Sequence, residues 1–153
     1  MMGQYWLVVN LDKKEYVHPH KLGAGLKLWE QLAASPGTGA ALIILCAAMP
    51  ESRGGGDFAT ADSEDASYEA VASRTIGRWA GDRVALVGDY AKDEDLAAEH
   101  HAKTLYNRCN AVDAEGNAIT SEFTDVSDDV AKVIEHELGG KFVGEGWREF
   151  KRE

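Results

Sequence analysis

The opening of the chain constrains the fold most, because it predicts a β-hairpin. Residues 4–11 (QYWLVVNL) are rich in β-branched and aromatic side chains, residues 12–14 (DKK) form a polar turn, and residues 15–20 (EYVHPH) continue as a second strand. A second hairpin is predicted further along, where residues 75–79 and 83–87 are joined by the turn AGD. Two hairpins predict an antiparallel sheet.

Helical spacing predicts an amphipathic helix within residues 21–34. Its apolar stripe consists of Leu22, Leu26, Trp29, Leu32 and Ala33. Residues 38–49 are uniformly apolar, so periodicity alone does not separate a helix from a strand there. Their alanines and their length favour a buried helix, with Cys46 in the core.

Residues 121–140 hold the clearest helical pattern in the chain. Its apolar stripe consists of Val126, Val130, Val133, Ile134 and Leu138. Asp128 and Asp129 favour the positive N-terminal end of this helix, and Gly139 supplies a C-cap. We therefore expect this helix to pack on the sheet.

The segments on either side of this helix are less regular. Residues 96–102 predict a short helix, and residues 104–109 could be a strand or the end of that helix. In the tail, three aromatic residues are expected to return to the core: Phe142, Trp147 and Phe150.

Strand pairs that alternate with helices, rather than β-α-β units, predict the α+β class. In this fold an antiparallel sheet of two β-hairpins carries about three helices on one face. A chain of 153 residues is of ordinary size for one domain, so we assign residues 1–153 to a single α+β domain. Within it, residues 53–73 are glycine-rich and acidic with few large apolar side chains, which predicts a mobile acidic loop with room for a helical turn near residues 68–73.

The net charge of the chain argues against functions that require binding to nucleic acid. A formal net charge of -10 repels phosphate over the whole surface, so we expect no contact with nucleic acid. No apolar run approaches the ~20 residues that cross a bilayer, and the opening residues lack the basic region of a secretory signal. We expect a cytoplasmic protein with reduced cysteines and no membrane contact.

The sequence RGGGD, which comprises Arg53, Gly54, Gly55, Gly56 and Asp57, has two interpretations. Its glycines permit conformations in which successive N–H groups point at an anion, and the neighbouring arginine could pair with a phosphate. The Lys and Ser or Thr of a Walker loop are missing, as is the spacing of a dinucleotide loop. The other interpretation, a hinge for the acidic loop, is the favoured one.

His18 and His20 flank Pro19 at strand spacing, so both imidazoles would lie on one face, as a metal pair requires. No metalloprotease spacing joins them to the residues that could supply a third ligand, namely Glu99, His100, His101 and His136. A divalent metal is therefore one interpretation. Two hydrogen-bonded or surface histidines are the other, favoured interpretation.

Polar residues stand at both ends of the predicted strand 83–87: Asp82 and Arg83 at the turn, and Asp89 and Tyr90 where the strand leaves the sheet. Asp89 could act as a general base or metal ligand, and Tyr90 could stack on a base or sugar. The alternative is that the aspartates are simply good turn residues, with Trp79 in the core.

Three stretches carry a resemblance: MGQYWLVVNLDKKEYVHPHKLGAGLKLWE, RGGGD and IGRWAGDRVALVGDY. Over most of its length the chain resembles a group of small bacterial and phage-associated proteins that begin MGQY and carry a PHxxGxGLKL segment. No activity is assigned to that group, so the resemblance implies no catalytic residue. It implies only that certain residues belong to shared segments: His20, Gly23, Gly25, residues 53–57, Trp79, Asp82 and Asp89.

We therefore expect a small acidic protein that binds an anionic small molecule, such as a nucleotide, in a cleft between HPHKLGAG and RGGGD. The predicted site comprises His20, Arg53, Gly54, Gly55, Gly56, Asp57, Asp82, Arg83, Asp89 and Tyr90. One alternative is a metal-dependent phosphoester hydrolase that uses His18, His20 and Asp89. Another is an interaction protein of phage defence or counter-defence whose acidic segment binds a basic protein.

Overall fold

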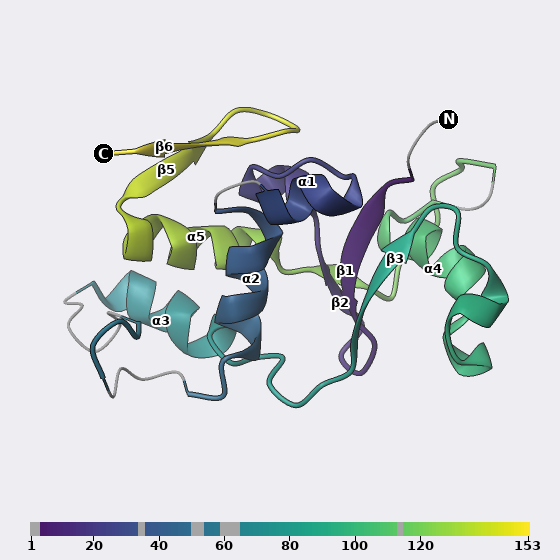
Figure 1. The fold of residues 1–153 in the computed structure, drawn as a ribbon, viewed down its shortest axis with the longest axis horizontal. Coiled ribbons are helices and arrows are strands. Elements are labelled where there is room, and N and C mark those ends of the chain that lie inside the picture. The colour runs from purple at the N-terminus through teal and green to yellow at the C-terminus, as the bar shows by residue number, and fades with distance from the viewer. Residues whose placement is uncertain (1–3, 34–35, 50–53, 59–64, 113–114) are drawn as a thin grey trace.

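The computed structural model describes residues 4–33, 36–49, 54–58, 65–112 and 115–153. Within these residues the fold is α+β, as the strand and helix patterns predict. It comprises five α-helices, a mixed four-stranded sheet and a separate two-stranded sheet. Figure 1 shows the larger sheet with α4 on one side and the other helices on the opposite side.

The N-terminal hairpin is confirmed. β1 (Trp6–Asn10) pairs antiparallel with β2 (Glu15–Val17), with Val9 opposite Tyr16. On its other side β1 pairs antiparallel with β3 (Val84–Gly88), and β2 is joined in parallel by the short β4 (Thr124–Asp125). The order β3-β1-β2-β4 therefore makes a mixed sheet, not an antiparallel sheet of two hairpins.

The second predicted hairpin is wrong, because residues 75–79 form no strand. The main-chain N–H groups that a strand would use are taken by the end of α2 (Gly37–Cys46). Gly77 N–H donates to Ile44 O at 2.9 Å, and Trp79 N–H donates to Leu45 O at 2.8 Å. These bonds satisfy carbonyls that a helix end leaves without partners.

The five helices are α1 (Leu28–Ala33), α2 (Gly37–Cys46), α3 (Ala66–Thr75), α4 (Ala102–Cys109) and α5 (Ser127–Leu138). In the described part of the chain, short 3-10 turns lie at Pro19–Leu22, Asp93–Asp95 and Ala98–His100. Helix is thus the correct alternative for residues 38–46 and for residues 104–109. α5 is confirmed, including its C-cap at Gly139, where the left-handed φ of 68° favours glycine.

In the second half of residues 53–73 the helical turn expected near residues 68–73 is a full helix, because α3 begins at Ala66. Its N-cap is Asp65, whose carboxylate accepts hydrogen bonds from the N–H groups of Ser67 and Tyr68. Tyr68 and Val71 then anchor the helix in the core. Arg53 and residues 59–64 lie outside the described residues, and Gly54–Gly56 lie in an exposed turn.

A C-terminal hairpin, β5 (Gly140–Val143) with β6 (Glu149–Arg152), is an element that the sequence patterns did not predict. Phe142 and Phe150 pair across it, with ring centroids 5.1 Å apart, and both pack against the core. Trp147 at the tip is instead 57% exposed. Two of the three tail aromatics therefore return to the core as expected.

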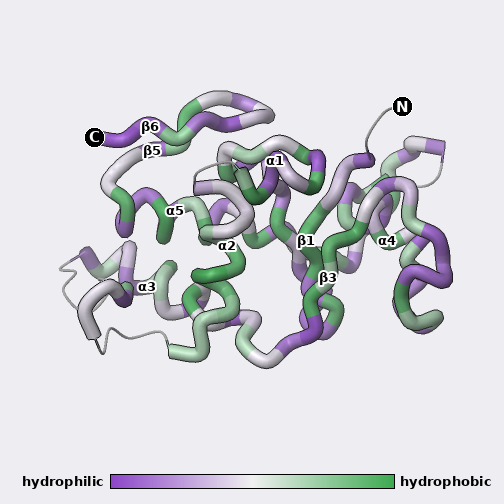
Figure 2. The backbone as a smooth tube through the Cα atoms, viewed as in Figure 1, coloured by the Kyte–Doolittle hydropathy of each residue, from purple (hydrophilic) through white to green (hydrophobic). Residues whose placement is uncertain are grey.

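The larger sheet is buried on both faces, where the prediction placed helices on one. Val8 and Val17 join a cluster with residues of α2, α3 and α5, whereas Leu7 and Val9 join a second cluster with residues of α4. Successive side chains of a strand point to opposite faces, so residues 7–9 of β1 are all apolar and all buried. Figure 2 shows β1, β3 and α2 as hydrophobic segments in the middle of the molecule.

No helix among the described residues is long and apolar enough to cross a membrane. Cys46 was expected in the core, but it lies exposed at the end of α2. Cys109 on α4 is buried. Both cysteines are free thiols, as predicted.

Candidate functional site

The residues predicted to form one site are placed in separate parts of the fold. His18 and His20 lie beside the N-terminal end of α5, where Ser127 Oγ accepts a hydrogen bond from His18 N–H at 2.7 Å. The exposed turn of residues 54–57 lies at the other end of α5, in a groove that includes Glu137 and Leu138. Since α5 has twelve residues, these ends are about 18 Å apart.

The two histidines lie close together, but His20 belongs to a 3-10 turn rather than a strand. Their ring centroids are 5.4 Å apart, and the His20 ring stacks on Trp147 at 4.8 Å. Burial lowers the pKa of His18, and the neighbouring His20 lowers it further. Burial also lowers the pKa of His20. His18 Nδ1 is buried without a hydrogen-bond partner among the described residues.

A metal centre lacks a third ligand in the described part of the chain, where no three His, Cys, Asp or Glu side chains are grouped to hold an ion. Two of the residues proposed for that role have other neighbours. His136 stacks on Tyr68 with centroids 3.7 Å apart, and Glu99 lies 3.6 Å from Arg83. The metal interpretation therefore stays a prediction that rests on two histidines.

The turn around Gly54–Asp57 borders an apolar groove of about 690 Å³ between α2 and α5. Ile43, Met49, Phe58 and Leu138 contribute to its walls. Asp57 and Glu137 are the acidic residues that line it. An apolar groove with carboxylates suits an anion poorly, because carboxylates repel negative charge and apolar walls donate no hydrogen bonds.

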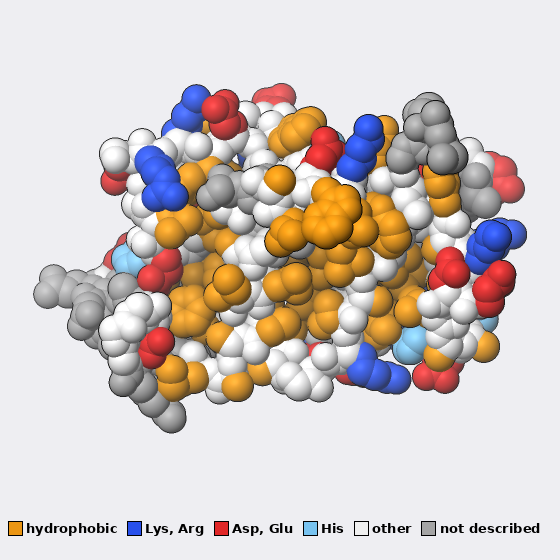
Figure 3. Space-filling model, viewed as in Figure 1, with side chains coloured by type: hydrophobic (Ala, Val, Ile, Leu, Met, Phe, Trp, Pro, Cys, Tyr) orange, Lys and Arg blue, Asp and Glu red, His pale blue; other side chains and the backbone are white. Residues whose placement is uncertain are grey.

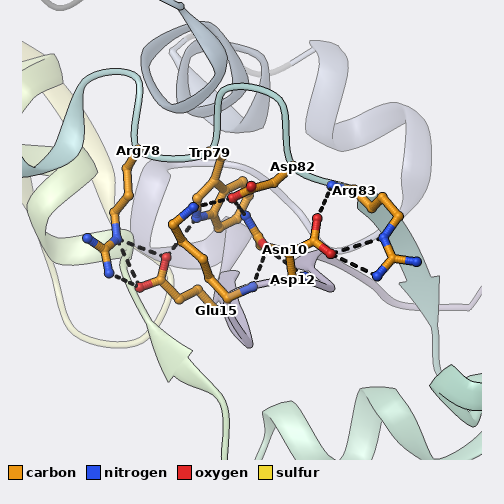
Figure 4. A network of polar contacts seen from close by, with 8 residues as sticks. Asn10, Asp12, Glu15, Arg78, Trp79, Asp82 and Arg83 are labelled. Atoms are coloured by element: carbon orange, nitrogen blue, oxygen red, sulfur yellow. Dashed lines mark hydrogen bonds and ion pairs between the residues drawn. The ribbon is translucent and has the colours of Figure 1, made fainter.

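Asp82 and Arg83 belong to a network of ion pairs at the β1–β2 turn (Figure 4). Asp82 accepts hydrogen bonds from Lys13 Nζ and from Asn10 Nδ2, and these bonds lower the pKa of the Asp82 carboxyl. The Arg83 guanidinium donates two bonds to Asp12 Oδ1, at 2.8 and 3.0 Å. Both side chains therefore hold the turn against the segment before β3.

A buried carboxylate in this network is a residue that sequence reasoning missed. Glu15 is only 5% exposed and accepts hydrogen bonds from Trp79 Nε1 at 2.9 Å and from Arg78 Nε at 2.9 Å (Figure 4). A signal was present, because Glu15 and Val17 are two residues apart in a strand and so share a face. An acid on a core-facing position requires a buried partner.

Asp89 and Tyr90 lie beyond the opposite end of β3 from Asp82. Asp89 Oδ1 accepts the main-chain N–H of Tyr5 at 2.9 Å, and Tyr90 N–H donates to Gln4 Oε1 at 3.3 Å. The Tyr90 side chain is 58% exposed. Because β3 separates Asp82 from Asp89, the two aspartates do not form one rim.

The strongest candidate for a functional surface is apolar and includes Trp29 and Leu32 of the predicted amphipathic stripe. α1 is oriented by Gln31, which is buried and donates to Trp6 O at 2.9 Å and Leu26 O at 3.0 Å. The Gln31 amide oxygen accepts from Thr38 Oγ1 at 3.1 Å. With the polar residue held inside, the apolar stripe of α1 faces outward: Trp29 is 76% exposed and Leu32 67%.

We call this surface the α1–α2 face and define it by Leu28, Trp29, Leu32, Leu42 and Leu86. They line a hollow of about 210 Å³ whose walls are almost entirely apolar. Figure 3 shows hydrophobic side chains gathered in a broad band across the middle of the molecule, over α1, α2 and β3. Large contiguous apolar patches of this kind mark interaction sites in proteins.

Comparisons with protein-family models, with curated proteins and with solved structures find no match. The function is therefore argued from the surface itself.

We predict that Arg78→Met destabilises the protein by about 3–5 kcal/mol, because it leaves the Glu15 carboxylate buried without its cation. Glu15→Gln in the Arg78→Met background should restore part of this loss, since an amide oxygen still accepts the Trp79 indole N–H. Urea unfolding measures both values. Arg74→Met is the control: its exposed pair with Asp129 is expected to contribute about 0–1 kcal/mol. Purely additive effects of the Glu15 and Arg78 changes would contradict this account.

We predict that stability falls as the pH drops below 6.5, the ordinary pKa of histidine. The pKa of His18 and of His20 is lowered on folding, so the unfolded chain takes up protons first and the loss continues down to the folded pKa values. Urea unfolding from pH 7 to about pH 5 should show this decline in the parent protein and in an exposed-site control, His101→Gln. A His18→Leu/His20→Leu variant with an unchanged decline would refute the assignment.

Proposed function

We propose that this protein acts by binding another protein through the α1–α2 face. The observation that supports this most strongly is the outward orientation of α1. Trp29 and Leu32 are mostly exposed, while Gln31 of the same helix is 2% exposed and fully hydrogen-bonded to its surroundings. Exposing the apolar side of a helix to water has a cost that a partner would remove by covering it.

The composition of the face supports a protein partner over a small molecule. Its hollow is small, and Trp29 on its wall is 76% exposed. Small-molecule sites bury most of the ligand and carry a few convergent polar groups. Protein interfaces instead have an apolar centre in which Trp is enriched.

The other functional hypotheses stay predictions. An anionic ligand near His20 or Arg53 and a metal-assisted phosphoester hydrolysis at His18 and His20 rest on the residue types alone. Binding of a basic protein by the acidic segment rests on five acids: Asp57, Asp62, Glu64, Asp65 and Glu69. Asp62 and Glu64 lie outside the described residues, and Asp65 caps α3.

We predict that Trp29→Ser weakens binding of the partner about 30-fold or more, as truncation of a central interface Trp typically does. Its effect on the melting temperature should be small, because Trp29 is 76% exposed. Partners are captured from the host cell with the tagged protein, purified, and titrated by calorimetry against each variant.

Trp147→Ser is the matched control, since Trp147 is also exposed but lies on the C-terminal hairpin. The proposal requires that the control variant keeps the affinity of the parent. Equal losses for both variants, or no loss for Trp29→Ser, would contradict it.

A further inference from the structure

The edge of the larger sheet next to the α1–α2 face is open. β3 is the outermost strand on that side of the sheet, and β1 is its neighbour. Arg83 O accepts from Leu11 N–H, and Asp89 N–H donates to Tyr5 O. In an antiparallel ladder these bonds alternate, so the main-chain groups of residues 83, 85, 87 and 89 point toward β1.

The main-chain groups of Val84 and Leu86 therefore point away from β1. No described residue donates to or accepts from them. The Leu86 residue is 39% exposed and separates the hollow of the α1–α2 face from a second hollow of about 380 Å³, lined in part by Trp6 and Tyr90. An added strand would have room on both sides of Leu86.

β3 also lacks the features by which monomeric proteins protect an edge strand. Its sequence is Val-Ala-Leu-Val-Gly, with no lysine, no proline and no inward charge. Edges of this kind are templates for pairing with another strand. The charges stand just outside the strand and have opposite sign, Arg83 before it and Asp89 after it.

From this geometry, and resting on the proposed function, we infer that the partner is a second copy of this chain, whose β3 pairs antiparallel with β3 across a two-fold axis at Leu86. In that register residue 83 of one copy lies opposite residue 89 of the other, because both are three residues from Leu86. Each Arg83 then faces an Asp89, twice in the dimer. Opposite charges at directly opposed positions stabilise a strand pair.

The Arg83 guanidinium and the Asp89 carboxylate each keep hydrogen-bonding capacity for this cross-strand contact. Arg83 uses Nε and Nη2 on Asp12, while its Nη1 lies 3.6 Å from Glu99. Asp89 uses Oδ1 on the Tyr5 N–H. The cross-strand pair therefore does not require the network of Figure 4 to break.

The apolar surface fits a two-fold contact as well. A two-fold axis perpendicular to the sheet keeps the same face on the same side, so the two α1–α2 faces become neighbours across the joined edge. A stable interface buries roughly 800 Å² per partner. The α1–α2 face supplies an apolar centre for such an interface, and the β3 edge adds main-chain hydrogen bonds.

The test is sedimentation equilibrium of the full chain from about 1 µM to about 1 mM at ~0.15 M salt, where the net charge of -10 is screened beyond about 8 Å. The inference predicts a reversible rise from the chain mass of 16.6 kDa to twice that value. Leu86→Lys should abolish the dimer. Ile119→Lys, at an apolar residue of similar exposure, should keep it.

Exchanging the charges at residues 83 and 89 distinguishes a loss of β3–β3 pairing from a loss of folding. Arg83→Glu and Asp89→Arg should each weaken self-association about tenfold or more, because each places like charges opposite one another. Mixed together, the two variants should form a heterodimer in which both pairs attract again. A change that merely damages the fold would show no such rescue.

A parent protein that stays monomeric at the highest concentration would overturn the inference, as would a Leu86→Lys variant that still dimerises. Failure of the mixed variants to associate would overturn the register. The proposed function fails separately, when Trp29→Ser and Trp147→Ser bind equally to a purified protein partner and also self-associate equally.

Discussion

The buried carboxylate of Glu15 is the contact on which the arrangement of this fold depends. It joins β2 to the segment after α3, through Arg78 and the indole of Trp79. The Trp79 side chain is fully buried, and its main-chain N–H donates to the end of α2. One acid therefore fixes a strand, a connecting segment and a helix relative to one another. A buried charge tolerates only an arrangement that supplies its partners, so this contact is specific as well as stabilising.

The position of β3 follows from that connection. With residues 78 and 79 held against β2 and α2, the chain continues through Asp82, which Asn10 and Lys13 hold at the β1–β2 turn. β3 then runs along the free side of β1, and no other described strand pairs with its outer edge. α1, turned by Gln31, exposes its apolar side next to that edge. The open edge and the apolar face thus meet at Leu86, within the hydrophobic band of Figure 3.

An element of this fold could be predicted from the sequence only where the residues that fix it are close to one another in the chain. α5 was predictable because its apolar stripe and its glycine C-cap lie within one short segment, although Leu138 at the end of that stripe is 39% exposed. The orientation of α1 was not predictable from spacing. The partners of Gln31 are Trp6, Leu26 and Thr38, which only the tertiary fold brings together. Residues 75–79 read as a strand for the same reason, because the carbonyls of α2 that accept their N–H groups are about thirty residues earlier.

For the candidate site, the sequence indicated individual residues but not the contacts that those residues make. Asp82 and Arg83 were recognised as distinctive, but their partners Asn10 and Asp12 are about seventy residues away, so their structural role stayed hidden. His18 and His20 are close together as expected. The α1–α2 face was missed because exposed and buried apolar stripes have the same spacing in sequence.

Amide hydrogen exchange within β3 tests most directly whether its edge is open and self-paired. In dilute protein the amides of Ala85 and Val87, which face β1, should be protected, while those of Val84 and Leu86 exchange rapidly. Raising the protein concentration should protect Val84 and Leu86 and leave Ala85 and Val87 unchanged. Slow exchange of Leu86 at every concentration would show that the chain covers its own edge. Rapid exchange of Leu86 at every concentration would show that no second copy pairs there, and either result would contradict the account.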